Sequence, residues 1–216
     1  GKGDSFSAGI DITMFMSDMS INENLSSTPQ DRRELMDLVA RMQGAFTTIA
    51  KSKIPTIALA HGFCIGGATS LVSACDIRLA TKDAKFSIGE TKLGLVADVG
   101  VIQRMPKIVS SGDMNELALT GRIFDGEHAE KIRFVSKVYE NSDDLFEAGE
   151  KLANEISSNS KRIVQATKEA LEKSSNLTVD QGLEYAKLWS TSFLVSEDLR
   201  EGVMAFLEKR DPKFNE

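Results

Sequence analysis

Two carboxylates stand eight positions apart in a stretch that is otherwise apolar and rich in glycine. Glu90 follows the residues Phe-Ser-Ile-Gly, and Asp98 lies within the run Leu-Gly-Leu-Val-Ala-Asp-Val-Gly. Carboxylates in such surroundings are rarely buried without a partner or a task. Two of them beside one pocket could remove a proton from one end of a substrate and return a proton at the other end. General acid–base catalysis of this kind typically accelerates a reaction by about 10²–10⁴-fold.

A structural interpretation of the same two residues competes with the catalytic one. Asp98 could cap a helix that begins near Val101, and Glu90 could pair with Arg78 or Lys92. Buried acids with shifted pKa values are often structural, so the residues by themselves favour capping or pairing.

A pair of glycines, Gly66 and Gly67, opens a predicted helix directly after an apolar run. Amides at a helix N-terminus are free to donate, and the helix dipole favours negative charge there. With a second amide from Ala8-Gly9, where a strand turns, they would form an oxyanion hole for a carbonyl that becomes an enolate. The glycines would equally allow a helix to pack closely on a strand, so the pair alone leaves both roles open.

Other chemistries find less support in the sequence. His61 and His128 are the only histidines, and without a cysteine cluster they predict no metal site. We expect His61, at the end of an apolar strand, to make a buried hydrogen bond. Ser70 has no histidine at a helpful spacing, which argues against a serine nucleophile.

Composition excludes several classes of partner. The net charge is −6, whereas a protein that binds nucleic acid or an anionic membrane surface needs a basic surface. No apolar run approaches the roughly 20 residues of a membrane span. Cys64 and Cys75 show no metal-binding spacing and favour a reduced, intracellular setting.

A long helix is predicted to begin after Thr28. Thr28 would be its N-cap, with proline at the first helical position and Asp31 three residues after the cap. Apolar residues at three- and four-residue spacing predict that one face is buried: Leu35, Leu38, Val39, Met42, Ala45, Phe46 and Ile49.

The stretch that carries the glycines and acids alternates between strands and a helix. Strands are predicted at residues 56–60, 76–80 and 85–88, with the helix after Gly66-Gly67 between the first two. This alternation predicts an α/β layer with parallel pairing.

The rest of the chain is predicted to be helical, near residues 113–120, 143–157, 161–173, 178–194 and 197–209. We therefore expect a core at residues 1–140 and a C-terminal helical region at residues 141–216. The last two helices have little local sheet to cover and would form a second layer or an oligomer contact. Their apolar stripes comprise Leu183, Ala186, Leu188, Trp189, Leu199, Val203, Phe206 and Leu207.

These motifs resemble the crotonase, or enoyl-CoA hydratase/isomerase, superfamily. Residues 6–11 look like its FSAGxD motif, and residues 61–67 look like its HGxxxGG motif. Residues 74–78, 119–122 and 201–210 also match, so the resemblance follows the chain in order. It implies an α/β crotonase-type ββα spiral with a C-terminal helical region that packs in trimers.

Within the superfamily, residues 94–107 are most similar to the Δ3,5-Δ2,4-dienoyl-CoA isomerases. Hydratases typically have glycine-rich sequence where Asp98 stands. The resemblance implies that the amides of Ala8 and Gly67 hold the thioester oxygen of an acyl-CoA substrate. It also implies that Glu90, nearer carbon 2, and Asp98, nearer carbon 6, move a proton along a 3,5-dienoyl chain to give the 2,4-dienoyl product of fatty-acid β-oxidation. The resemblance thus reverses the preference for capping or pairing.

The resemblance further implies a substrate site, with no cofactor beyond the coenzyme A that is part of the substrate and with no metal. The segment from Ala8 to Ile12 would contact the adenosine end of coenzyme A. The expected substrate-binding residues are Ala8, Gly9, Ile10, Asp11, Ile12, Gly66, Gly67 and Ser70.

Three departures from the family pattern matter. Ser70 stands where hydratases have glutamate and typical dienoyl-CoA isomerases have aspartate, which argues against water addition and weakens the isomerase assignment. Arg133 replaces a usual glycine before Phe134-Val135, so we expect a different local backbone path because a left-handed turn would cost about 1 kcal/mol or more. The family's opening strands are absent, which indicates a fragment or an incomplete sheet with an open edge.

Alternatives follow from these departures. The chain could be a Δ3-Δ2-enoyl-CoA isomerase, which needs one carboxylate base, or a catalytically idle protein that binds acyl-CoA. The resemblance implies a homotrimer or a hexamer of two trimers, located in mitochondria or peroxisomes. No C-terminal peroxisomal signal is present.

Overall fold

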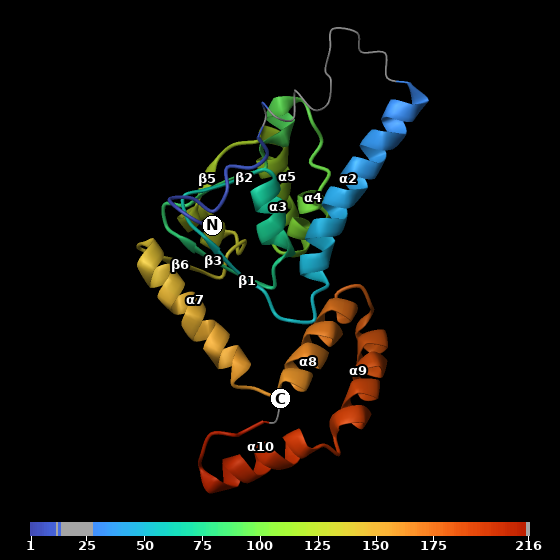
Figure 1. Ribbon diagram of the computed structural model, residues 1–216, viewed down its shortest axis with the longest axis vertical. Helices are drawn as coiled ribbons and strands as arrows, with labels where there is room; N and C mark the ends of the chain where they lie inside the picture. Colours follow the sequence, from blue (N-terminus) through green and yellow to red (C-terminus); the bar gives the residue numbers. More distant parts are fainter. Residues whose placement is uncertain (12, 14–27, 215–216) are drawn as a thin grey trace. The chain divides into compact units, whose positions relative to one another are not determined.

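The chain forms two compact units, seen in a computed structural model that describes residues 1–11, 13 and 28–214. Unit 1 comprises residues 1–52 and 56–147, and unit 2 comprises residues 53–55 and 148–216. Unit 1 contains the strands, and unit 2 is helical (Figure 1). None of the helices in the described part of the chain combines the length and the hydropathy that a bilayer crossing requires.

Short strands form two three-stranded sheets in the described part of unit 1. One sheet has the order β1-β3-β6 with parallel pairs throughout. The other has the order β2-β4-β5, in which β4 is parallel to β2 and antiparallel to β5. The three predicted strands and the predicted parallel pairing are confirmed by β1, β3 and β4. The strands are Ile57–Ala60 (β1), Phe63–Ile65 (β2), Ile77–Thr81 (β3), Lys85–Ser87 (β4), Phe124–Asp125 (β5) and Lys137–Tyr139 (β6).

The chain passes from one sheet to the other and then into a helix. Residues 61–62 link β1 to β2, and residues 82–84 link β3 to β4. Helix α3 (Gly67–Ala74) follows β2 and returns the chain to β3 in the first sheet. Because Ile65 pairs with Ser87, the ends of β2 and β4 meet beside the start of α3. This β-β-α path is the predicted crotonase-type spiral.

The other helices of unit 1 cover the sheets or carry the connecting turns. Helix α2 (Pro29–Ala50) packs against α3 (Figure 1). The helical elements are Pro29–Ala50 (α2), Gly89–Leu93 (η1), Val101–Arg104 (α4), Met105–Lys107 (η2), Ser111–Thr120 (α5), Gly126–Lys131 (α6) and Ser142–Ser157 (α7), which continues into unit 2.

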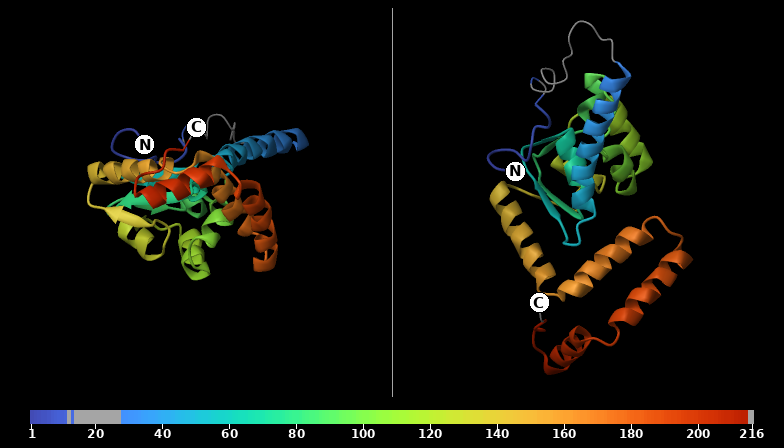
Figure 2. Two further views of the ribbon diagram at one scale, coloured as in Figure 1. Left: turned by 90° about the horizontal axis from the view of Figure 1, so that it is seen from below. Right: turned by 45° about the vertical axis from the view of Figure 1, so that its right-hand side comes forward.

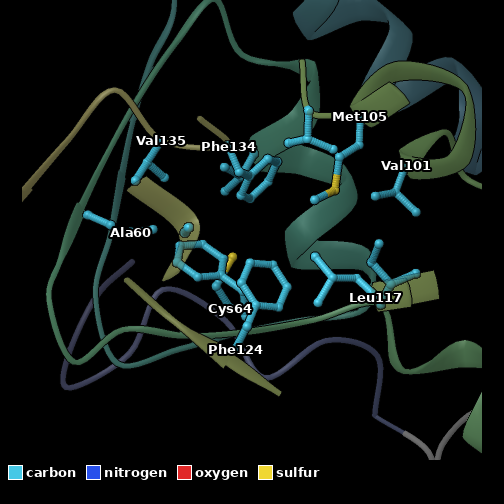
Figure 3. Packing of buried hydrophobic residues seen from close by; sticks show 14 of the residues in the cluster. Ala60, Cys64, Val101, Met105, Leu117, Phe124, Phe134 and Val135 are labelled. Atoms are coloured by element: carbon cyan, nitrogen blue, oxygen red, sulfur yellow. The ribbon is translucent and has the colours of Figure 1, made fainter. Parts of the chain in front are cut away.

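A dry core of aromatic and aliphatic side chains holds unit 1 together. Phe86 of β4 stacks on Phe124 of β5 and meets Phe134 edge-on, each with ring centroids 5.5 Å apart. Cys64 of β2 and Leu117 of α5 are fully buried in the same cluster (Figure 3). Aromatic pairs of this geometry add about 0.5–1.5 kcal/mol beyond the area they bury. The core thus joins the second sheet to the helices that flank the glycine pair.

Helix α2 begins as predicted but is less buried than predicted. Thr28 is the N-cap, and Thr28 and Asp31 form a reciprocal capping box. The predicted buried face is wrong, because no residue of α2 is fully buried and Leu35 is 41% exposed. The apolar stripe packs on one side against neighbouring helices of unit 1, so residues such as Leu38 and Phe46 are half-buried.

The turn at Arg133 keeps its left-handed conformation without a glycine. Arg133 has φ 67°, and its own amide and that of Phe134 donate to the last turn of α6. The prediction of a different local path is therefore wrong. The following strand, β6, begins at Lys137 rather than at Phe134-Val135.

Unit 2 consists of helices that begin and end close to their predicted limits. Helices α8 (Lys161–Ser174) and α9 (Val179–Phe193) lie side by side, joined by a short turn (Figures 1 and 2). Helix α10 (Glu197–Glu208) is fixed to the start of α8, because buried Asp198 accepts a hydrogen bond from Ser160 Oγ at 2.6 Å.

Candidate active site

The first turn of α3 is fixed where two strands end. Its N-cap, Gly66, has φ 58° and ψ −116°, a conformation that a residue with a Cβ rarely adopts. The Gly66 amide donates to Ser87 O at 2.9 Å. Thr69 Oγ1 lies 2.7 Å from Cys64 O and 3.0 Å from Ser87 O, so its hydroxyl joins α3 to both β2 and β4. No motif or spacing in the sequence marks Thr69.

The segment that contains Ala8 runs beside β2. The Ser7 amide donates to Phe63 O at 2.9 Å, and the Ile65 amide donates to Ser7 O at 3.1 Å. This parallel bridge places Ala8 next to the turn that begins α3. Neither the Ala8 amide nor the Gly67 amide donates a hydrogen bond to another described residue. Two amide donors are therefore available at the same end of β2.

Close packing does not explain the glycine at position 67. A Cβ added to Gly67 would have no atom of a non-neighbouring residue within 4 Å. The alternative in which this glycine serves helix–strand packing is therefore wrong. A side chain at position 67 would therefore enter open space.

Glu90 lies beside the glycine pair, on the turn η1. That turn is held to α5 because Thr91 Oγ1 donates to Ala118 O at 2.7 Å. Oε1 of Glu90 is 3.6 Å from the position of a Cβ on Gly66, and Oε2 is buried without a hydrogen-bond partner. Burial raises the pKa of Glu90, and the negative charge of Asp98 raises it further. A half-buried carboxylate with a raised pKa suits a general base.

Asp98 interacts electrostatically with Glu90 but lies in a different environment. Its side chain is exposed, whereas its neighbours Ala97 and Val99 are 5% and 8% exposed. The side chains of Ala97 and Val99 are thus packed in the core, whereas that of Asp98 between them faces solvent. Glu90 is half-buried, which agrees in part with the prediction that both acids lie in apolar surroundings. For Asp98 the prediction is wrong, because its side chain is exposed in the single chain.

The structural alternatives for the two acids are wrong as well. The N-cap of α4 is Gly100, and no side chain caps that helix. Arg78 donates to Phe134 O and Cys75 O, both at 2.7 Å. No described residue forms an ion pair with Glu90. Neither acid is thus occupied by the structural task that the sequence suggested.

Two further residues near the glycines are buried. Ser70, one helical turn after Gly66, is fully buried, and its Oγ has no hydrogen-bond partner. Its hydroxyl thus lies in the core without a partner among the described residues. Nε2 of His61 lies 3.0 Å from Gly3 O, which confirms the predicted buried hydrogen bond.

The remaining predicted substrate-binding residues follow Ala8. The Gly9 amide donates to Ser7 Oγ at 3.2 Å, Ile10 is 55% exposed, and Asp11 Oδ1 accepts from the amide and hydroxyl of Thr13. Ile12 lies outside the described residues. Across the described ranges, no group of three or more potential ligands is placed to hold a metal ion.

One residue near Asp98 could not have been found from the sequence. Nε2 of Gln43, on α2, donates to the backbone oxygen of Asp98 at 2.7 Å. The two residues are 55 positions apart, and no local pattern marks Gln43.

Comparisons with known proteins agree with the fold and the motifs. A family model described as enoyl-CoA hydratase/isomerase matches residues 1–216. The mitochondrial Δ(3,5)-Δ(2,4)-dienoyl-CoA isomerase of Dictyostelium discoideum is 43% identical over 214 residues, which cover 99% of this chain and 73% of that protein. The peroxisomal Δ(3,5)-Δ(2,4)-dienoyl-CoA isomerase of Arabidopsis thaliana is 39% identical, with 99% and 77% covered.

Solved structures show the same similarity. Pseudomonas aeruginosa DspI superimposes with a TM-score of 0.86 and 29% identity, over 100% of this chain and 78% of that one. An enoyl-CoA hydratase from Bacillus anthracis gives a TM-score of 0.81 and 28% identity, over 90% and 74% of the two chains.

Proposed function

The chain belongs to the enoyl-CoA hydratase/isomerase family, and on that premise we propose that it converts 3,5-dienoyl-CoA thioesters to 2,4-dienoyl-CoA thioesters. Two relatives named for this isomerisation are 43% and 39% identical over nearly the whole chain. The observation that supports the proposal is the position of the Glu90 carboxylate beside Gly66, at the start of the helix whose Gly67 amide, like that of Ala8, donates to no described residue; the charge of Asp98 acts on Glu90. Such an arrangement suits proton transfer along an acyl thioester.

The first step removes a proton from carbon 2. The amides of Ala8 and Gly67 donate to the thioester oxygen, which gains negative charge as the carbanion forms. The ionised carboxylate of Glu90 takes the proton, and the electron pair enters the conjugated system. Desolvation of Glu90 favours this step, since a carboxylate with a raised pKa is the stronger base.

The second step adds a proton at carbon 6. The Asp98 carboxyl group delivers it, the double bonds move to positions 2 and 4, and the thioester carbonyl is restored. One proton has left carbon 2 and one has reached carbon 6, so no oxidant or reductant is consumed. Between turnovers Glu90 gives up the proton that it took from carbon 2, and Asp98, which is exposed to solvent, takes one up, so both groups return to their starting states. Coenzyme A takes part only as the thioester half of the substrate.

The test follows the absorbance of the conjugated product. Purified protein with 3,5-dienoyl-CoA should show a rising dienoyl absorbance, and Glu90→Gln and Asp98→Asn should each lower kcat by about 10²–10⁴-fold. Asp83→Asn, which changes an exposed acid in the turn between β3 and β4, is the matched control. Full activity in both site variants would contradict the paired-acid mechanism.

A second candidate is a Δ3-Δ2-enoyl-CoA isomerase, which is favoured by the exposure of Asp98. That reaction moves a proton only from carbon 2 to carbon 4 and needs a single base, which Glu90 would supply. Faster turnover of 3-enoyl-CoA than of 3,5-dienoyl-CoA, with no loss in Asp98→Asn, would select this function. Acyl-CoA binding measured by calorimetry, with turnover of neither substrate, would identify a protein that only binds acyl-CoA.

We also propose that the chain assembles as a homotrimer or as a hexamer of two trimers. The stripes predicted on α9 and α10 are exposed in the single chain, with Leu188 at 65%, Phe206 at 83% and Leu207 at 69%. Exposed large apolar side chains that gather in a patch are typical of association sites. Light scattering on the purified protein tests this, and a monomer at micromolar concentration would contradict it.

The relatives named above are mitochondrial and peroxisomal, and we propose one of these compartments for this protein. Imaging of the tagged protein in its own cells tests the assignment, and diffuse cytosolic signal would contradict it.

A further inference from the structure

Helix α2 holds the loop that carries Asp98 through two side chains. Gln43 and Thr47 are four residues apart and therefore lie on the same face of the helix. Nε2 of Gln43 donates to Asp98 O at 2.7 Å. Nη2 of Arg104 donates to Thr47 Oγ1 at 3.1 Å, and Nη1 of the same guanidinium donates to Val99 O at 3.3 Å. Two consecutive backbone oxygens, at positions 98 and 99, are thus fixed by side chains.

Besides these hydrogen bonds, the loop is held by the buried side chains of Ala97 and Val99 on either side of Asp98, while the residues before Ala97 are exposed. Leu95 and Val96 are 48% and 77% exposed, so apolar packing does not hold the residues directly before Ala97. After Asp98, Gly100 has φ 116°, and a Cβ there would lie 1.9 Å from Nη1 of Arg104. The backbone therefore turns in a conformation that suits glycine, directly beneath the guanidinium that reaches α2.

The direction of the Asp98 side chain depends on this backbone. Its carboxylate is exposed and is not held by packing, so its position follows from the peptide groups on either side of its Cα. Misplacing a catalytic group by about 1 Å can cost about 10²-fold in rate. A contact that fixes the Asp98 carbonyl is thus placed to control how reliably the carboxyl group reaches carbon 6.

We propose that Gln43 is a positioning residue for Asp98, supported by the Thr47–Arg104 contact to the next peptide group. The proposal rests on the proposed dienoyl-CoA isomerisation. Gln43 does not touch the substrate in this proposal. It fixes the loop from which Asp98 protonates carbon 6, and it has no effect on proton removal from carbon 2 by Glu90.

Replacing Gln43 with leucine tests the proposal, because leucine keeps much of the volume and lacks the donor. We expect kcat for 3,5-dienoyl-CoA to fall by about 10–10²-fold with KM nearly unchanged. Exchange of the carbon 2 proton with solvent, which needs only Glu90, should keep its rate. Gln43→Lys, which retains a long side chain with a donor, should recover part of the lost rate.

The matched control is Gln30→Leu, the same change on the same helix. Gln30 is exposed and donates to Glu34 Oε1 at 2.9 Å, within α2 itself. This variant should keep wild-type kcat. Thermal unfolding of each variant checks that α2 remains folded.

A double-mutant cycle with Asp98→Asn separates positioning from a general structural role. If Gln43 acts through Asp98, Gln43→Leu should cause no further loss in the Asp98→Asn background. Unchanged kcat in Gln43→Leu, or an equal loss in both backgrounds, would overturn the positioning role while leaving the proposed function intact. A wild-type protein without dienoyl-CoA turnover would overturn the proposed function and this assignment together.

Discussion

Replacing Arg133 with glycine is expected to stabilise the protein by about 0.5–1 kcal/mol. Arg133 follows α6 with φ 67°, at the position where helices that end in a left-handed turn usually have glycine. The Arg133 amide donates to Glu130 O at 2.9 Å, and the Phe134 amide donates to Ala129 O at 2.8 Å. These two bonds define a Schellman motif, and its geometry requires the left-handed residue.

The magnitude is the difference between two opposing effects. A residue with a Cβ in the left-handed region costs about 1–2 kcal/mol, which glycine would recover. Glycine in turn makes the unfolded chain more flexible, at a cost of about 0.5–1 kcal/mol. The Arg133 side chain is exposed, so its removal exposes no core.

Urea and thermal unfolding measure this effect directly. A gain of about 0.5–1 kcal/mol corresponds to a Tm increase of roughly 1–4 °C for a chain of this size. Lys131→Gly is the matched control, since Lys131 is an exposed cation at a helical position of α6. There glycine should destabilise by about 0.5–1 kcal/mol. An Arg133→Gly variant that is no more stable than the wild type would refute the strain that we assign to this turn.

Three other variants give clear expectations. Burial raises the pKa of Glu90 above the ordinary 4.5, and the charge of Asp98 raises it further. In a pH–rate profile, kcat/KM should therefore fall as the pH drops through this raised pKa, because Glu90 must be ionised to act as a base. Asp98→Asn removes the charge and should move the acidic limb of the profile to lower pH. Gly67→Ala should leave Tm nearly unchanged, since its Cβ meets no neighbouring atom, but it should raise KM about tenfold or more in steady-state assays by entering the substrate's space. Phe86→Ala should cost about 3–5 kcal/mol in urea unfolding, because Phe86 is fully buried against two aromatic rings.

Local signals in the sequence predicted the elements well because the physics that sets them is local. The Thr28 capping box depends on side chains within one helical turn, and the structure has it as predicted. Strand β1 was marked by a short apolar run after Pro55, and strand β3 by a short run that ends before the turn residues Lys82-Asp83. The glycine pair at the start of α3 was identified from its place after an apolar run, and Gly66 has a backbone conformation that other residues rarely adopt.

Burial and long-range contacts could not be predicted from the same patterns. The apolar stripe of α2 predicted a buried face, but the burial of Leu38 or Phe46 depends on which surfaces other elements supply. The apolar run around Asp98 suggested that its side chain is enclosed, but the side chain is exposed although its neighbours Ala97 and Val99 are buried. The hydrogen bond from Gln43 to Asp98 O joins residues 55 positions apart and leaves no local signal.

Deuterium labelling tests most directly whether two carboxylates move the proton. The protein converts 3,5-dienoyl-CoA in D₂O, and NMR locates deuterium in the substrate and the product. We predict deuterium at carbon 6 of the product for the wild type, loss of that label with retained exchange at carbon 2 in Asp98→Asn, and loss of both in Glu90→Gln. Undiminished labelling of carbon 6 by Asp98→Asn would contradict the assigned role of Asp98.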